Sequence, residues 1–108
     1  MSYRQINVNP LKRVDSDCFI RALSCATGKS WDRVYEQISD IAQSQGAMMN
    51  DGRFVLDYLD RRYKRVPVGT TVDETSKMYK NNIILITMRG HITCSKFGEI
   101  YDSFYPRK

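Results

Sequence analysis

Long hydrophobic runs are missing from this sequence. The longest apolar stretch covers only residues 83–86, whereas a membrane-spanning helix needs about 20 apolar residues. The first ten residues, MSYRQINVNP, also lack the apolar core of a secretory signal. These absences exclude a membrane span and predict a protein that stays in the cytoplasm.

Histidine and cysteine are scarce. His91 is the single histidine, and the three cysteines, Cys18, Cys25 and Cys94, are an odd number in a chain without an export signal. This favours reduced thiols over a disulfide framework. A structural zinc ion needs paired soft ligands, and the C-x6-C spacing supplies no such pair. We therefore expect neither a metal nor another cofactor.

The sequence does contain enough apolar material for one core. Its 108 residues are 42% hydrophobic and 11% aromatic, a composition that excludes wholesale disorder. A chain of this length leaves no room for a second domain. We therefore predict a single domain over residues 1–108.

Positive charge is in excess, with a formal net charge of +5. Such an excess favours nucleic acids or acidic partners. The cations are spread out, however, and the only dense cluster, Arg61–Arg65, suits the negative end of a helix dipole. A nucleic-acid-binding module that uses this cluster, with Tyr58 and Tyr63 stacking on bases, is a minor alternative.

Capping residues and apolar periodicity predict three helices in the first half of the chain. The first covers about residues 16–27 and ends at Gly28, and the second lies between the N-cap Ser30 and Gly46. A third opens at Asn50 or Asp51. Their expected apolar faces are, in turn, Phe19, Ala22, Leu23 and Ala26; Trp31, Val34, Tyr35, Ile38, Ile41 and Ala42; and Phe54, Val55, Tyr58 and Leu59.

The segment after these helices changes in character. Residues 65–68 are expected to be extended, and the proline among them confines the stretch to a sheet edge. Thr71 and Glu74 then form a capping box, which predicts a short helix ending near Asn81.

The last part of the chain has the residues of a β-sheet. Residues 83–88 are apolar on both faces, which is typical of a central strand. Residues 91–97 and 99–104 predict two strands that fold back at Gly98. Because helices precede an antiparallel sheet, we predict an α+β domain with N-terminal helices packed on a C-terminal sheet.

Cys18 falls in the first turn of the first predicted helix. Backbone N–H groups without helical partners and the positive end of the helix dipole lie there, and such a site lowers the pKa of a thiol. The N–H of Cys18 is also placed to donate to a developing oxyanion. Unless they face away or cap the helix, Asp15 and Asp17 act in the opposite sense, because nearby negative charge raises a thiol pKa. Cys18 is the candidate nucleophile.

His91 starts a predicted strand and is the candidate base. A two-residue turn at 97–98 or 98–99 points His91 and Asp102 to the same face of the hairpin. With the first of these turns, Asp102 pairs with Thr93 and His91 is its diagonal neighbour, about 7–8 Å away between backbones. A three-residue loop would reverse this parity. A carboxylate in that place orients the imidazole and favours its charged form.

The other polar and thiol side chains have weaker assignments. Gln5, Asn7 and Asn9 are candidate second donors to an oxyanion only because they precede the nucleophile in the chain. Cys25 lies two turns beyond Cys18 in the same helix, and Cys94 points away from His91 on its strand. We interpret both as core residues.

Three segments carry a resemblance to a known family. They are DCFIRALSCATGKSW at 17–31, GAMMND at 46–51 after a helix, and GHITCSKFGEIYDSF at 90–104. With these segments in this order, the chain resembles the small papain-like cysteine peptidase-fold proteins of bacteriophages and bacteria. The resemblance implies a minimal papain-like domain with Cys18 as nucleophile, His91 as general base and acid, and Asp102 as the orienting residue.

Two main functional hypotheses follow. The first is a thiol hydrolase that cleaves an amide or isopeptide bond in a protein or peptide substrate, as a peptidase, isopeptidase or side-chain deamidase. The second is a non-catalytic binding protein on the same scaffold, for instance a viral inhibitor of a host protein in the host cytoplasm, because a fold does not guarantee activity. The hydrolase is the leading hypothesis.

Overall fold

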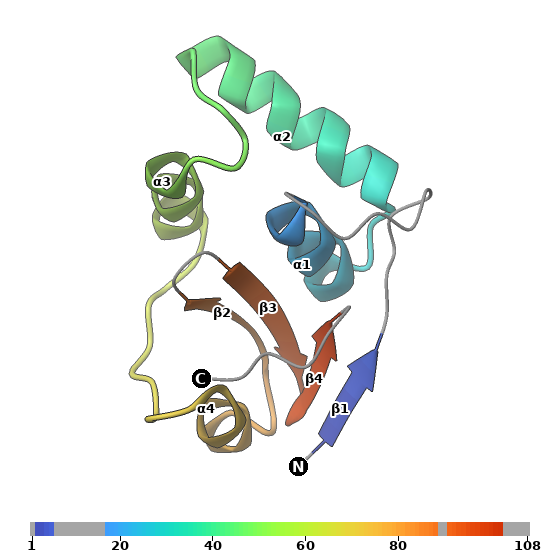
Figure 1. Cartoon of the computed structure of the whole chain (residues 1–108), viewed down its shortest axis with the longest axis vertical. Helices are drawn as coiled ribbons and strands as arrows, with labels where there is room; N and C mark the ends of the chain where they lie inside the picture. The colour runs from blue at the N-terminus through green and yellow to red at the C-terminus, as the bar shows by residue number, and fades with distance from the viewer. Residues whose placement is uncertain (1, 6–16, 89–90, 103–108) are drawn as a thin grey trace.

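All of the described helices precede the last three strands in the computed structural model, which describes residues 2–5, 17–88 and 91–102. Within these ranges there are four helices and four strands (Figure 1). In chain order they are β1 (Ser2–Gln5), α1 (Cys18–Thr27), α2 (Trp31–Gln45), α3 (Gly52–Arg62), α4 (Val72–Met78), β2 (Ile83–Met88), β3 (His91–Lys96) and β4 (Glu99–Asp102). The predicted α+β class is confirmed.

Four boundaries of the first three helices lie at capping residues that the sequence predicts. Gly28 and Gly46 have left-handed φ angles of 78° and 66° and terminate α1 and α2. The Ser30 hydroxyl accepts a hydrogen bond from the third residue of its helix, and the Asp51 carboxylate caps α3 in a similar way. Local chemistry therefore fixes these boundaries.

Two segments between α3 and β2 differ from the prediction. Residues 65–68 form no strand in the structure, since the chain there joins no ladder of the described sheet. The helix α4 does start after Thr71, whose hydroxyl accepts from the Glu74 N–H. It ends at Met78 rather than near Asn81, because successive tight turns lead the chain into β2.

The sheet has the order β1-β4-β3-β2, in which β2, β3 and β4 are antiparallel and β1 is parallel to β4. In the described sheet β2 therefore lies at an edge, and the prediction of a central strand is wrong. Its apolar character has another cause: Leu85 faces the core under α1, and Ile86 faces the core over α4. An edge strand covered by helices on both faces therefore has the same run of apolar residues as a central strand.

The hairpin between β3 and β4 has the first of the two predicted turns. Phe97 and Gly98 are its two central residues, with φ angles of 53° and 82°, as a type I′ turn requires. Lys96 pairs with Glu99, and Cys94 pairs with Tyr101. Continuing this register brings residue 93 opposite residue 102. The fourth strand is described as far as residue 102, so residues 103–104 of the prediction lie outside the described residues.

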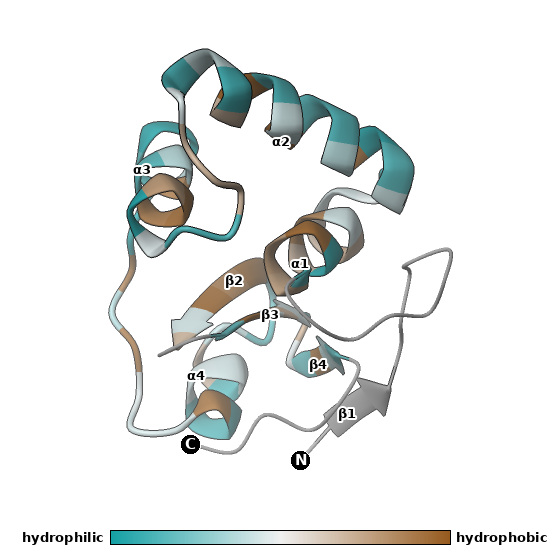
Figure 2. Ribbon diagram, turned by 45° about the horizontal axis from the view of Figure 1, so that its top comes forward, coloured by the Kyte–Doolittle hydropathy of each residue, from teal (hydrophilic) through white to brown (hydrophobic). Residues whose placement is uncertain are grey.

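Two apolar cores lie on the two faces of the sheet. The larger core joins α1, α2 and α3 to β3, and the smaller joins α4 to β2 and β4. Figure 2 shows hydrophobic residues on α1 and β2, whereas α2 is mainly hydrophilic. The buried members of the larger core are Phe19, Ile20, Ala22, Leu23, Cys25, Val34, Ile38, Ala42, Phe54, Tyr58, Leu59, Ile92 and Cys94.

The longest described helix, α2, is amphipathic. Val34, Ile38 and Ala42 are its buried residues, and they share one face at helical spacing. The other described helices are shorter. In the described part of the chain, no helix combines the length and the hydropathy that a membrane crossing requires.

The left-handed turn residue Gly98 gives a test of the hairpin. A Cβ at this position would lie 3.2 Å from the Lys80 Cβ and would also strain the positive φ angle. We expect Gly98→Ala to lower the free energy of unfolding by about 1–2 kcal/mol in urea denaturation. Gly52→Ala is the matched control, because no atom lies within 4 Å of its added Cβ and its φ is not left-handed. Equal stability of the two variants would contradict this account of the turn.

Candidate active site

The helix α1 begins at Cys18, and a network around Asp17 holds this end of the helix. Asp17 is the N-cap residue, but its side chain makes no capping hydrogen bond. Its carboxylate instead forms an ion pair with Arg21 at 3.1 Å and accepts a hydrogen bond from Trp31 Nε1 at 3.1 Å. Because Trp31 is the first residue of α2, this network ties the start of α1 to the start of α2.

The Cys18 thiol lies at the junction of α1 and β3. It is partly buried and makes hydrogen bonds with the His91 side chain and the backbone N–H of Ile92. Burial alone would raise the pKa of this thiol, but these two hydrogen bonds and the nearby charges of His91 and Arg21 outweigh burial. The net effect lowers the pKa of Cys18 below its ordinary value.

The His91 imidazole is held on its other side by Asp102. Its Nε2 atom lies 2.7 Å from the Asp102 Oδ2 atom, and the two side chains are only 14% and 6% exposed. This is the diagonal neighbour relation that the predicted turn implies. Since Nε2 faces the carboxylate, Nδ1 is the nitrogen left for Cys18.

The two partners of His91 change its protonation. The hydrogen bond to Asp102 raises the pKa of His91, the hydrogen bond to Cys18 adds to it, and together they bring it to about 9 despite partial burial. A lowered thiol pKa and a raised imidazole pKa favour the same state, a thiolate beside an imidazolium. Residues from α1, β3 and β4 thus form one hydrogen-bonded chain, Cys18–His91–Asp102, called the triad below.

Asp17 is not among the groups that raise the pKa of Cys18. Asp17 is paired with Arg21, so its charge is balanced, and the net shift of the Cys18 pKa is downward. Asp15 lies outside the described residues, as do Asn7 and Asn9. For Gln5, the structure describes the backbone in β1 and not the side chain.

Sequence reasoning missed Arg21 as part of the site. Its side chain is 8% exposed, and its charge helps to lower the pKa of Cys18, three residues earlier in α1. The signal was present: Asp17 and Arg21 have the i, i+4 spacing of a helical ion pair. The Ile92 N–H was missed too, because only the packing of β3 against α1 directs it at the sulfur.

The other two cysteines lie in the core, as predicted. Cys25 is 8% exposed and Cys94 is fully buried, and both belong to the larger core. Among the described residues, no group of three or more histidine, cysteine, aspartate or glutamate side chains could hold a metal ion.

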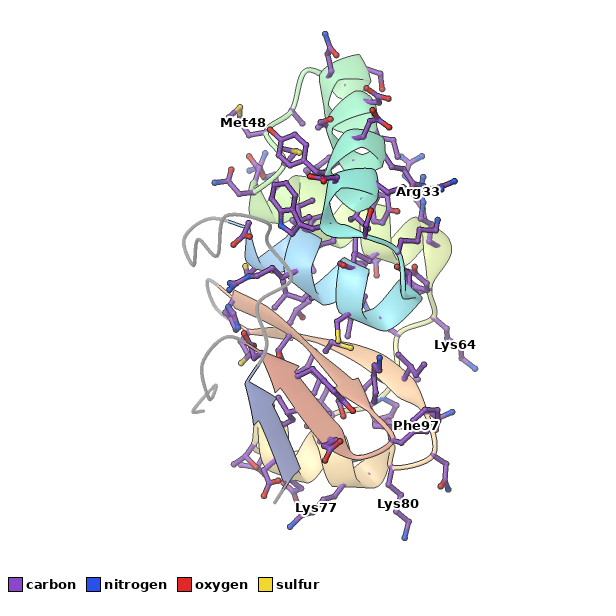
Figure 3. All side chains as sticks on the ribbon, turned by 90° about the vertical axis from the view of Figure 1, so that its right-hand side faces the viewer. Arg33, Met48, Lys64, Lys77, Lys80 and Phe97 are labelled. Atoms are coloured by element: carbon purple, nitrogen blue, oxygen red, sulfur yellow. The ribbon has the colours of Figure 1, made fainter. Side chains whose placement is uncertain are left out.

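The three arginines of the basic cluster at the end of α3 are exposed, and each contacts another side chain of the same chain. Arg61 pairs with Asp57, and Arg65 makes two hydrogen bonds to Asp60. Arg62 lies 3.9 Å from the centre of the Tyr58 ring, which is itself buried. Tyr58 therefore cannot stack on a base, and that part of the nucleic-acid hypothesis is wrong. Lys64 of this cluster projects into solvent (Figure 3).

Comparisons of the chain with models of protein families, with curated proteins and with solved structures find no match.

The single histidine makes the raised pKa of His91 directly measurable. In an NMR titration we expect its imidazole proton signals to change with a midpoint near pH 9, so that the ring keeps its positive charge through neutral pH. Asp102→Asn removes the carboxylate that contributes most, and the midpoint should fall well below that of the native chain. Asp73→Asn, in a partly exposed ion pair of α4, should leave the midpoint unchanged. A native midpoint near 6.5 would contradict the proposed electrostatics.

The buried ion pair beside Cys18 can be compared with an exposed one. Arg21→Met leaves the Asp17 carboxylate buried without its cation, and we expect a loss of about 3 kcal/mol in the free energy of unfolding. The same change at Arg61, whose pair with Asp57 is exposed, should cost less than about 1 kcal/mol. The double variant Asp17→Asn/Arg21→Met should recover part of the loss. Similar losses for the two single variants would show that burial of the pair has no special effect.

Proposed function

We propose that this protein is a thiol hydrolase acting on amide or isopeptide bonds, with Cys18 as nucleophile, His91 as general base and acid, and Asp102 as the orienting residue. The observation that carries the proposal is the triad: the thiol, the sole imidazole and a buried carboxylate are hydrogen-bonded in sequence. This is the arrangement by which a base activates a nucleophile and a third group orients the base.

In the first half of the reaction, the Cys18 thiolate attacks the carbonyl carbon of the substrate. Negative charge develops on the carbonyl oxygen, and the backbone N–H of Cys18, at the start of α1, is in the region of the helix that stabilises it. The His91 imidazolium then gives its proton to the departing amine. An acyl group remains on the Cys18 sulfur.

In the second half, His91 acts as a base. It removes a proton from a water molecule, which attacks the thioester and releases the acid and the Cys18 thiolate. Asp102 stays bonded to Nε2 throughout, so the ring keeps Nδ1 toward the sulfur and its positive charge is stabilised. Peptidase, isopeptidase and deamidase reactions share these steps.

A minimal papain-like fold is part of the same proposal. It is supported by a nucleophile at the start of a helix, followed in the chain by a histidine and then a carboxylate on neighbouring strands. A cytoplasmic protein of phage or bacterial type, acting on a protein or peptide, fits this proposal. The alternative is a binding protein with the same fold and no catalytic activity. It differs from the proposed hydrolase only in that it does not turn over a substrate.

Selective alkylation tests whether the triad activates Cys18. With iodoacetamide at neutral pH, Cys18 should react faster than the two buried thiols, Cys25 and Cys94, as measured by peptide mass spectrometry. The midpoint of its rate against pH should lie below the ordinary thiol pKa of 9.0, because the pKa of Cys18 is lowered. His91→Ala should move this midpoint upward. The variant loses the hydrogen bond and the positive charge of His91, which lower the pKa of Cys18, while burial still raises it. Equal labelling of the three thiols would rule out an activated Cys18.

Acylation and turnover separate a hydrolase from an inactive binding protein. With p-nitrophenyl acetate as the probe, we expect acetylation of Cys18 and its subsequent hydrolysis over many cycles. Asp102→Asn should slow both steps, and His91→Ala should slow them by roughly 10²–10⁴-fold, the usual contribution of a general base. Cys18→Ser is the background control. Stable acetylation at Cys18 without release would favour the binding protein.

A further inference from the structure

A second pair of side chains joins α1 to β3 inside the larger core. Cys25 in α1 and Cys94 in β3 are both free thiols and both belong to that core. Lys96, two residues after Cys94 in β3, donates to the Cys25 carbonyl oxygen, so this part of β3 lies against Cys25, and each thiol shifts the pKa of the other. Cys94 is 0% exposed and Cys25 is 8% exposed. Neither thiol has a role in the proposed hydrolysis, so this contact needs a separate explanation.

The Cys18–His91 and Cys25–Cys94 contacts are separated by a similar distance along α1 and along β3. Cys25 follows Cys18 by seven residues of helix, a rise of about 10.5 Å. Cys94 follows His91 by three residues of strand, a rise of about 10 Å. The helix and the strand therefore run side by side in the same direction, with the Cys18–His91 contact at one end and the Cys25–Cys94 contact further along.

The two thiols are chemically unequal. The interaction with Cys94 lowers the pKa of Cys25, and the nearby charge of Lys96 acts in the same direction. The Lys96 ammonium is held there, because it donates to the Cys25 carbonyl oxygen at 3.2 Å. The same interaction and deeper burial raise the pKa of Cys94. Cys25 is thus the more accessible and more easily ionised partner.

We propose that Cys25 and Cys94 form an oxidation site, at which a peroxide closes a disulfide between α1 and β3 and so alters the Cys18–His91 contact. The thiolate of Cys25 attacks one oxygen of hydrogen peroxide, and the O–O bond breaks to give a sulfenic acid and hydroxide. The hydroxide takes up the proton that Cys25 released on ionisation and becomes the first water. The Cys94 sulfur attacks the sulfenic sulfur, its proton leaves with the hydroxyl group as the second water, and the S–S bond forms. The two thiols supply the two electrons that reduce the peroxide.

The new bond affects the triad through the rigid elements that carry both contacts. A disulfide holds its sulfur atoms about 2 Å apart, which is closer than the sulfur atoms of two separate thiols can approach. The bond therefore draws α1 toward β3 at Cys25, and the spacing at Cys18 changes with it. A regulatory consequence of this change rests on the proposed function, whereas the disulfide itself does not.

The test uses the full chain with Cys18→Ser, so that only the two core thiols can react. After hydrogen peroxide treatment, unfolding and addition of N-ethylmaleimide, mass spectrometry should show loss of both alkylation sites and loss of two hydrogens. Dithiothreitol should restore both sites. The control is Cys18→Ser/Cys94→Ala, in which Cys25 is the single thiol. This thiol should stay reduced or be oxidised without forming an intramolecular disulfide. If this variant does not fold, Cys18→Ser/Cys25→Ala serves as the control. Two thiols that still alkylate, or Cys25 as a sulfinic acid beside a reduced Cys94, would overturn the proposal.

A second measurement tests the link to the triad without any catalysis. In the Cys18→Ser chain, the imidazole NMR signals of His91 should shift on oxidation and return on reduction. The oxidised chain should also melt several degrees higher, as expected for a closed loop. A disulfide that leaves the His91 signals in place would overturn the link. Because neither readout needs a substrate, absence of hydrolase activity does not affect the result.

Discussion

The packing of α1 against β3 is the interaction on which the candidate site depends. Phe19 and Leu23 of the helix and Ile92 of the strand share one buried core, and this core fixes the distance between the first residues of both elements. Cys18 is the first residue of α1, and His91 is the first residue of β3. The hydrophobic effect is not directional. Packing of these apolar side chains nevertheless aligns the Cys18 thiol with the His91 imidazole, whose hydrogen bond does depend on direction.

The register of the β3–β4 hairpin adds the third member. A shift of one residue would turn Asp102 to the opposite face of the sheet, and His91 would lose the contact that contributes most to its raised pKa. The turn prevents such a shift, because two successive residues with positive φ angles, Phe97 and Gly98, specify a two-residue connection. The electrostatics of the site are therefore set by the backbone conformation of a turn at the far end of the hairpin.

Local features of the sequence were sufficient for most of the helix boundaries, though not for the end of α4, and for the hairpin and the candidate residues of the triad. Gly28, Ser30 and Gly46 act through neighbouring backbone groups, so their roles can be predicted without the fold. Long-range contacts could not be predicted in this way. The parallel pairing of β1 with β4 and the edge position of β2 depend on segments far apart in the chain. The same holds for the hydrogen bond from Trp31 to Asp17 and for the Ile92 N–H at Cys18.

The wide separation of Cys18 and His91 along the chain also has a consequence for folding. The helix α1 can form early, because its hydrogen bonds are local, whereas contacts across this many residues form slowly. Until β3 and β4 pair and dock on α1, the thiol has neither the imidazole nor the Ile92 amide beside it. A partly folded chain therefore carries an unactivated cysteine, and chemical reactivity arises only together with the completed tertiary structure.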